Sequence, residues 1–452
     1  MPSKPYTPHP LRRRAVISGA AVSGAGLLVL PGKAPAAVAA KPLSGVTLNV
    51  SCWNAPYPQF LGKYIPEFEQ ETGARVIYTT PAFPIYNQRM DISLATHSDA
   101  YDVINVTFIY IGRWIGAGWV TPLDGFIANP KLTPAGWDAA DFLPGLTGAF
   151  RDPQGRLCAI PWIGDVIMGG AARYDLIKQA GLSMPDSFDE MAKMLAAVSG
   201  KDGLPGFTIE NHYGWTFVGY LQGFGGNIFR APPHDLMPVL DTPQAVHAAE
   251  FFATMVRKYG PRGALSYTYD QVVAELKAAR AIYTTENEAF VTQMVQKGMA
   301  SAPTAGFSLF PKGPAGRFPQ VATHGWGIPA GSRKKDAAWQ FIAWAMSKPL
   351  LLRMFREQGW SSVTRRSIID LPEYHAKLNL NGFDVAQTYL ETLNIAAHGY
   401  MAYRTVPAYP QIDRQIDIAL QSVISGEKKP QQAMADAQRN SLTALRRAGV
   451  KL

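Results

Sequence analysis

Apolar residues recur with two different periods in the segment from residue 46 to residue 120. Val46, Leu48 and Val50 alternate with polar residues, and this period of two predicts a strand that ends near Cys52. Apolar residues spaced three and four apart then predict a helix that ends at Gly73, a residue suited to a helix C-cap. Strands are also predicted over 75–78 and 101–106, each followed by a helical pattern. Alternating strands and helices predict a parallel sheet covered by helices.

The carboxyl ends of these predicted strands are the expected place for a ligand. In open α/β sheets, ligands bind outside the carboxyl ends of the strands. Those ends are residues 53–54 (WN), 79–81 (TTP) and 107–108 (TF).

The rest of the chain predicts a second group of elements with more helix. Ser187 and Glu190 form a capping-box pattern that opens a helix, and Thr242 begins another. A helix over 272–279 leads to a strand over 281–284, and a short strand over 325–329 precedes a helix that runs through 345. Helical patterns fill 412–445. A chain of 452 residues exceeds what one core supports, so two domains are expected.

The charge is concentrated at the N-terminus. The net charge is +9, but residues 1–40 hold five basic residues and no acidic one, so the rest of the chain carries only +4. No cluster of Lys and Arg is interleaved with aromatic residues, and we therefore expect no nucleic-acid partner.

Residues 1–40 are typical of an export signal. Arg12, Arg13 and Arg14 precede a Gly- and Ala-rich apolar run over 15–30, and small residues offer cleavage sites near Ala40. Arg13-Arg14 and the following AVI resemble a twin-arginine signal, with the Sec route as the alternative. An uncut membrane anchor is the other interpretation, but the run is short for one. We expect a periplasmic protein.

Motifs for catalysis or metal binding are mostly absent. The sequence has no nucleophile-elbow, H-E-x-x-H, Walker A or C-x-x-C motif, and GAG at 116–118 lacks the third glycine of a dinucleotide site. We therefore expect no enzyme, no cofactor and no metal. Cys52 and Cys158 could form a disulfide or be two buried thiols. Distant carboxylates could still assemble a site, so an exported carbohydrate-active enzyme remains an alternative.

Aromatic residues stand beside polar groups where strands are predicted to end. The segments concerned are Trp53-Asn54, Phe108 to Tyr110, Trp162 to Asp165, His212 to Trp215 and His324 to Trp326. Flat rings pack against the C–H faces of sugars, while carboxylates and amides bind the hydroxyl groups. These segments predict a pocket for a polyhydroxylated ligand, although each ring alone could belong to the core.

Asp165 is the one charged residue in the apolar stretch 157–170 (LCAIPWIGDVIMGG). A buried, unpaired charge costs several kcal/mol, so such a residue needs a partner or a ligand. Asp165 could accept hydroxyl hydrogens from a ligand, form an ion pair with Arg173 or cap the backbone.

Six segments in order resemble the bacterial extracellular solute-binding proteins of family 1, the maltose-binding-protein-like substrate-binding proteins of ABC importers. The matching segments are 64–73 (YIPEFEQETG), 101–124 (YDV to AGWVTPLD), 155–161 (GRLCAIP), 173–182 (RYDLIKQAGL), 185–190 (PDSFDE) and 326–342 (WGIPAGSRKKDAAWQFI). Together they span most of the chain after residue 40.

The resemblance implies a fold and a function. The fold is the two-lobed, type II periplasmic-binding-protein fold, an α/β fold with parallel-rich sheets flanked by helices and a helical C-terminal region. It implies an N-terminal lobe of 41–166 and 304–348, and a C-terminal lobe of 167–303 and 349–452. Ligand is held between lobes that close by a hinge motion. The expected partners are a carbohydrate or polyol and the membrane subunits of an ABC importer, and the protein is expected to be a monomer.

The resemblance also implies ligand contacts. Asp165 lies four residues past Pro161, where the family often places a cleft-facing acid. The other positions carried over are Trp53, Asn54, Thr107, Glu286, Trp326 and Arg404, and the aromatic pattern adds Tyr110 and Trp215. Thr107 stands where many sugar-binding members have an acid. Arg404 keeps an anionic solute, such as glycerol phosphate or an acidic or sulfonated sugar, as the alternative ligand.

Overall fold

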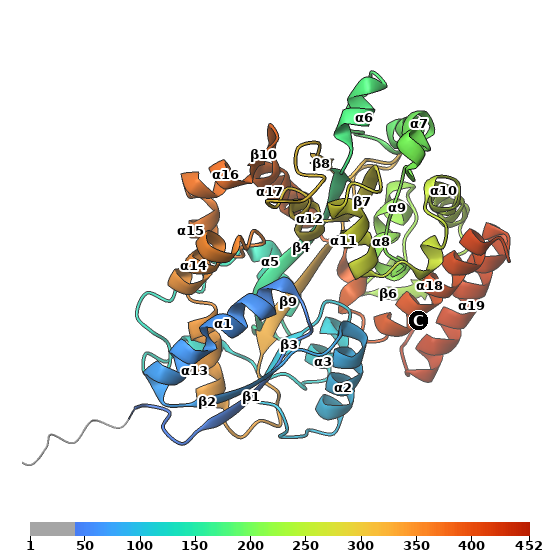
Figure 1. The fold of residues 1–452 in the computed structure, drawn as a ribbon. Helices are drawn as coiled ribbons and strands as arrows, with labels where there is room; N and C mark the ends of the chain where they lie inside the picture. The colour runs from blue at the N-terminus through green and yellow to red at the C-terminus, as the bar shows by residue number, and fades with distance from the viewer. Residues whose placement is uncertain (1–40) are drawn as a thin grey trace, which may run out of the picture. The chain divides into compact units, whose positions relative to one another are not determined.

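The computed structural model describes residues 41–452, and the predicted export signal over 1–40 lies outside the described residues. The first elements follow the predicted alternation. Strand β1 (Thr47–Ser51) pairs in parallel with β2 (Arg75–Thr79) and β3 (Val103–Val106), with helices α1 (Pro56–Thr72) and α2 (Phe83–Ala95) between them (Figure 1). Helix α1 ends as predicted at Gly73, whose φ of +77° requires glycine's freedom and whose N–H donates to the Glu69 carbonyl.

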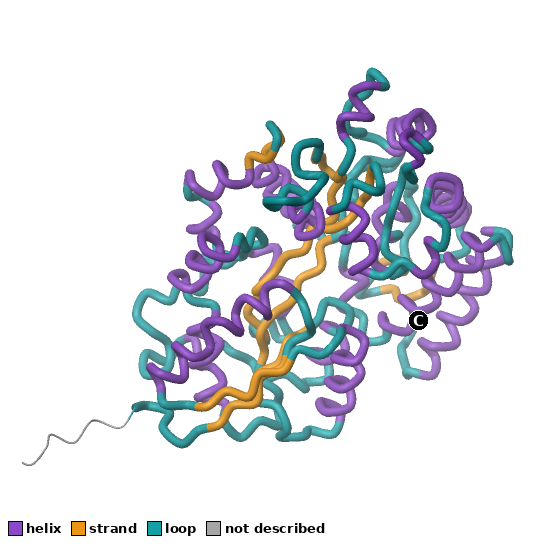
Figure 2. The backbone as a smooth tube through the Cα atoms, in the orientation of Figure 1, coloured by secondary structure: helices purple, strands orange, loops and turns teal. Residues whose placement is uncertain are grey.

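Two long strands extend this sheet. Strand β4 (Ala159–Ala171) pairs antiparallel with β9 (Val321–Gly327) through residues 159–166, and β9 also pairs antiparallel with β3. Beyond residue 166, β4 changes partners and pairs with β7 (Tyr283–Asn287) and β8 (Gly306–Leu309). The order is β2-β1-β3-β9-β4-β7, with β8 also on β4, and Figure 2 shows this continuous run of strands.

The sheet is mixed, where the sequence predicted a parallel-rich one. Only β2, β1 and β3 run parallel, since their connections are helical crossovers. Strands β4 and β9 are antiparallel to each other. Their other pairings within this sheet, of β9 with β3 and of β4 with β7 and β8, are antiparallel as well.

Helices supply most of the remaining structure. Between β3 and β9 they are α3 (Ile111–Gly116), α4 (Asp124–Ile127), α5 (Pro144–Thr147), α6 (Tyr174–Gln179), α7 (Phe188–Val198), α8 (Tyr213–Thr216), α9 (Val218–Gly223), α10 (Pro243–Tyr259), α11 (Tyr269–Lys277) and α12 (Glu288–Gln293). After β9 they are α13 (Lys335–Ala345), α14 (Lys348–Gln358), α15 (Arg366–Ile369), α16 (Pro372–Leu378), α17 (Val385–Ala396), α18 (Tyr409–Ser425) and α19 (Pro430–Arg447). Two short hairpins join β5 (Phe229–Ala231) to β6 (Asp235–Pro238) and β10 (Asn379–Leu380) to β11 (Phe383–Asp384).

Helix ends confirm the capping predictions in part. Ser187 Oγ accepts a hydrogen bond from the Glu190 N–H at the start of α7, but the Glu190 carboxylate accepts from the Asp186 N–H and not from Ser187. Thr242 Oγ1 accepts from the Ala245 N–H at the start of α10. Within residues 41–452, no helix combines the length and apolar character needed to cross a bilayer.

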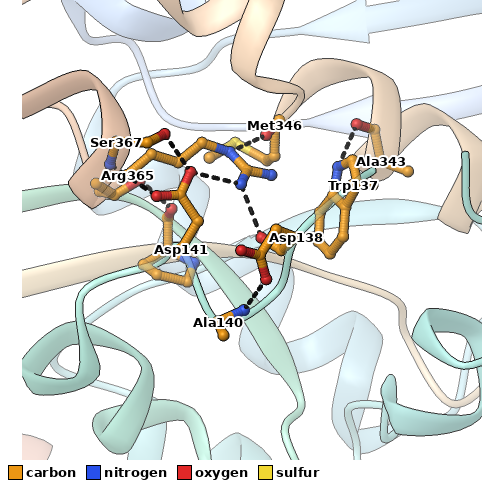
Figure 3. A network of polar contacts seen from close by, with 10 residues as sticks. Trp137, Asp138, Ala140, Asp141, Ala343, Met346, Arg365 and Ser367 are labelled. Carbon is orange, nitrogen blue, oxygen red and sulfur yellow. Dashed lines mark hydrogen bonds and ion pairs between the residues drawn. The ribbon is translucent and has the colours of Figure 1, made fainter. Parts of the chain in front are cut away.

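A buried ion pair joins three segments that are distant in the sequence (Figure 3). The Arg365 guanidinium, 1% exposed, donates to Asp141 Oδ2 at 3.1 Å and to the Met346 and Asp138 carbonyls. Ser367 donates to Asp141 through its N–H and its hydroxyl, both at 2.7 Å. Burial opposes ionisation of Asp141, but these hydrogen bonds outweigh it and lower the pKa of the carboxyl group. Cys52 and Cys158 are both buried free thiols.

Candidate functional site

A cavity of about 110 Å³ lies where the sheet meets the helices that follow β4. The sheet side contributes residues after β1, after β3, on β4 and on β9, and the other side contributes residues of 210–215, α11, α12 and the segment after α14. The lining residues are Trp53, Ala55, Pro56, Phe83, Phe108, Ile163, Asp165, Glu210, His212, Trp215, Tyr269, Asn287, Ala289, Phe290, Ala322, His324 and Trp360.

Aromatic rings form most of the cavity wall. The ring of Trp53 lies 5.1 Å from that of Phe83 and 5.2 Å from that of His324, measured between centroids. The ring of Phe108 lies 5.1 Å from that of Trp215. Trp53 and Phe108 are the second residues after β1 and β3, beyond the carboxyl ends of strands where a ligand was expected.

Asp165 brings an acceptor without a partner into this cavity. Its side chain is 7% exposed, and Oδ1 accepts no hydrogen bond from any residue of the described part. The Arg173 guanidinium binds Asp175 at 2.8 Å and Asp202 at 2.9 Å, so Arg173 is not the partner of Asp165. Burial, followed by the charges of Glu288 and Glu210, raises the pKa of Asp165 well above its ordinary value.

The same cavity also offers hydrogen-bond donors. The indole Nε1 atoms of Trp53 and Trp360 have no acceptor within residues 41–452. The Asn105 amide nitrogen lies 3.4 Å from His324 Nδ1, and because an amide nitrogen only donates, Nδ1 accepts and the ring proton sits on Nε2. Burial lowers the pKa of His324 to about 3, with the Arg404 charge acting in the same direction, so this ring is neutral at pH 7.

Beside the cavity, a cluster of acids surrounds His212. The His212 Nε2 atom lies 3.2 Å from Asp413 Oδ2, and the Gly214 N–H donates to Asp417 Oδ1 at 2.9 Å. Burial alone would lower the pKa of His212, but the neighbouring carboxylates raise it to about 10, so the ring is an imidazolium. Donor atoms of His212, Asp413 and Asp417 lie within 4.8 Å of one another and are the described group that could hold a metal ion.

Glu286 lies behind this cluster and does not line the cavity. It is fully buried on β7, and its Oε1 accepts a hydrogen bond from the Glu210 N–H at 2.8 Å. Its Oε2 has no partner in the described part of the chain. Burial, together with the charge of Glu210, raises the pKa of Glu286.

Three further predicted contacts lie away from the cavity lining. Asn54 is exposed and accepts from Gln59 at 2.8 Å. Thr107 is buried, and its hydroxyl donates to Asn87 Oδ1 at 3.1 Å. Trp326 is fully buried in the core.

Tyr110 and Arg404 were also predicted to contact the ligand, and neither lines the cavity. Tyr110 stacks on Trp114 at 5.0 Å and lines a separate groove against α18 and α19. The Arg404 guanidinium lies 5.1 Å from the rings of both Phe108 and Trp215 and donates to the Val321 carbonyl, so it supports two wall residues from behind.

Five lining residues with an aromatic or charged side chain were not singled out from the sequence. They are Phe83, Glu210, Tyr269, Phe290 and Trp360. Each stands at or near a helix end, where its side chain can turn toward the sheet, but the local pattern does not show which helix ends meet. Glu210 gave the one usable signal, because it lies two residues before the singled-out segment that begins at His212.

Comparison with known proteins places this geometry in a family. The family model for bacterial extracellular solute-binding proteins matches residues 54–349. The mannitol-binding protein of Pseudomonas aeruginosa is 26% identical over 382 residues, which cover 81% of this chain and 85% of that protein. The erythritol/L-threitol-binding protein of Mycolicibacterium smegmatis is 24% identical over 412 residues, which cover 85% of this chain and 83% of that protein.

A solved structure confirms the expected fold class. The solute-binding protein of an ABC transporter from Agrobacterium radiobacter K84, in complex with ribitol, superimposes with a TM-score of 0.79 at 22% identity, over 89% of this chain and 99% of that one. The fold is therefore the two-lobed α/β fold of periplasmic binding proteins. Since the family model covers well over half of the chain, this protein belongs to the family of bacterial extracellular solute-binding proteins.

Proposed function

We propose that the protein is an exported binding protein that captures a carbohydrate or polyol in the cavity and delivers it to an ABC importer. The observation that carries this proposal is the unpartnered Asp165 Oδ1 in an aromatic cavity that also offers indole donors. A hydroxyl group both donates and accepts, so a row of hydroxyls can satisfy both kinds of atom. The similarity to a mannitol-binding and an erythritol/L-threitol-binding protein supports the same ligand class.

The size of the cavity favours one small molecule. Its volume of about 110 Å³ is below the roughly 150 Å³ of an apolar cavity that binds benzene. An oligosaccharide needs a longer groove, whereas a single sugar alcohol or monosaccharide needs only modest opening of the walls.

An anionic ligand is disfavoured by the same walls. None of the described residues that line the cavity is Lys or Arg, and the charge of the lining residue His212 is already paired with Asp413. Arg404, the residue that kept the anionic alternative open, uses its guanidinium on the Val321 carbonyl and on Gln320 Oε1.

The mechanism rests on two lobes that close on the ligand. We assign 41–166 and 304–348 to the N-terminal lobe, and 167–303 and 349–452 to the C-terminal lobe. The change of partners of β4 between Val166 and Ile167 supports the first boundary. At the last boundary, helix α14, assigned to the C-terminal lobe, packs on α1 and α13 of the N-terminal lobe, and its Arg353 binds Glu67 at 2.8 Å, so these contacts run between the assigned lobes. Closure follows ligand binding because only the closed state contacts the ligand from both sides.

Export and delivery complete the proposal. The arginines at 12–14 and the apolar run over 15–30 support removal of a twin-arginine-like signal near Ala40 and a periplasmic location. The binding protein acts as a monomer with the membrane subunits of an ABC importer, and it needs no cofactor.

Thermal unfolding with a ligand panel tests this function. The panel contains mannitol, ribitol, erythritol, glucose, glycerol phosphate and a uronic acid. A ligand at about 1,000 times its Kd adds roughly 4 kcal/mol, which raises Tm by several degrees. We expect a shift with a polyol or sugar that Asp165→Asn reduces and that Asp270→Asn, an exposed neighbour of the cavity residue Tyr269, retains. A shift confined to the anions, or none with any polyol or sugar, would overturn the proposal.

A further inference from the structure

We infer that the preferred ligand is a polyol that carries a positively charged amino group, and that this ammonium group lies against Asp165 and Glu210. The inference rests on the proposed function and narrows its ligand class. It is drawn from the balance of charge around the cavity and from the chemistry of the cavity walls.

Carboxyl groups outnumber cationic groups around the cavity. Asp165 and Glu210 line it, and Glu286, Glu288, Asp413 and Asp417 are buried close by. Two cationic side chains of the described residues lie near these acids, and neither binds Asp165. His212 pairs with Asp413, and the Arg404 guanidinium binds the Val321 carbonyl behind the aromatic wall. Asp165 has no ion-pair partner within residues 41–452. Glu210 is half-buried, and the nearby charge of His212, which already pairs with Asp413, favours its ionisation.

A buried carboxylate without a counter-charge costs several kcal/mol. A proton, a metal ion or a cationic ligand can remove this cost. The group suited to a metal is His212, Asp413 and Asp417, which excludes Asp165 and whose atoms already bind one another or the Gly214 N–H. A proton can neutralise the Asp165 carboxylate when no ligand is bound. A ligand cation held between two carboxylates, however, gains an electrostatic attraction that a neutral hydroxyl group does not gain.

The walls of the cavity suit a cation as well. An ammonium group within about 6 Å of an aromatic face is attracted by the ring quadrupole, and the attraction grows when water is excluded. Trp53, Phe83, Phe108, Trp215, Tyr269 and Phe290 line the same cavity as the two carboxyl groups. Aromatic faces together with unpaired acids form a cage for an amine, while the indole donors remain for the hydroxyl groups of the same molecule.

Calorimetric titration with matched ligands tests the inference. D-Mannitol is compared with 1-amino-1-deoxy-D-mannitol, and D-glucitol with 1-amino-1-deoxy-D-glucitol, at pH 7.5 and with EDTA so that no metal supplies the charge. Within at least one pair, we expect the amine to bind ten-fold or more tightly than its neutral parent. Asp165→Asn should reduce that ratio to about one, Glu210→Gln should reduce it in part, and Asp270→Asn, which removes an equal but exposed charge, should leave it unchanged.

The possible results separate this inference from the proposed function. If the neutral polyol of each pair binds as tightly as its amine or more tightly, the inference is wrong while the proposed function stands. If the amine binds more tightly but equally so in Asp165→Asn and Glu210→Gln, the assignment of the ammonium site is wrong. If none of the four binds, the inference is wrong, and the thermal panel then decides the proposed function on the other sugars and polyols.

Discussion

At the scale of single residues, two residues of the cavity could be identified from their neighbours in the sequence. Asp165 was identified because it interrupts an apolar stretch, and Trp53 because it follows a strand end; both line the cavity. Trp326 shows the limit of this reasoning. It lies on β9 two residues beyond His324, on the same face but roughly 7 Å further along the strand, inside the core. Local pattern gives the face of a strand, but not where along that face the cavity ends.

Glu288 offers a prediction at this scale. Its Oε1 accepts hydrogen bonds from Ser361 and Ser362, whereas Oε2 has no partner in the described residues. Burial raises its pKa from the ordinary 4.5 to about 7. The unfolded state therefore loses this proton first as pH rises, and the wild type loses stability between pH 4.5 and pH 7, by up to about 3 kcal/mol.

Glu288→Gln removes this titration and keeps an oxygen acceptor for the two serines. We expect the variant to match the wild type near pH 4.5 and to be more stable above pH 7, in urea unfolding measured across this range. His324, whose lowered pKa gives the opposite slope below pH 6.5, is present in both proteins and cancels in the difference. A difference in stability that does not change with pH would contradict the account.

At the scale of elements, the sequence patterns predicted the short strands at the start of the chain and missed the long strand β4. Strands β1, β2 and β3 were predicted, and helix α1 ends at Gly73 as expected. Strand β4 has all of its residues buried, so it shows no alternation that a period of two could detect. The strand that carries Asp165 was thus visible only through the family resemblance.

The buried pair of Arg365 and Asp141 tests how distant segments are held together. Asp141→Asn would leave the buried guanidinium without a counter-charge, and such losses cost about 3–5 kcal/mol. We expect a clear fall in the urea midpoint. Asp138→Asn is the matched control, because Asp138 is exposed and Arg365 binds its backbone carbonyl, so this variant should change stability by less than about 1 kcal/mol. Equal effects of the two variants would contradict the importance of the pair.

At the scale of the whole chain, the cavity draws on segments far apart in the sequence. Trp53 and Phe83 come from the first elements, Glu210 and Tyr269 from the middle, and Trp360 follows α14. No local pattern predicts that these segments meet, and the order of the family motifs supplied that information. Side chains from both assigned lobes line one cavity, so a ligand held there joins the lobes directly.

A crystal structure of the protein with the polyol that gives the largest thermal shift is the most direct test of the central claim. We expect the polyol inside the cavity, with one of its hydroxyl groups donating to Asp165 Oδ1 and another accepting from the Trp53 indole N–H. A polyol bound outside this cavity, for instance in the groove beside Tyr110, or one bound inside it without touching Asp165, would contradict the account.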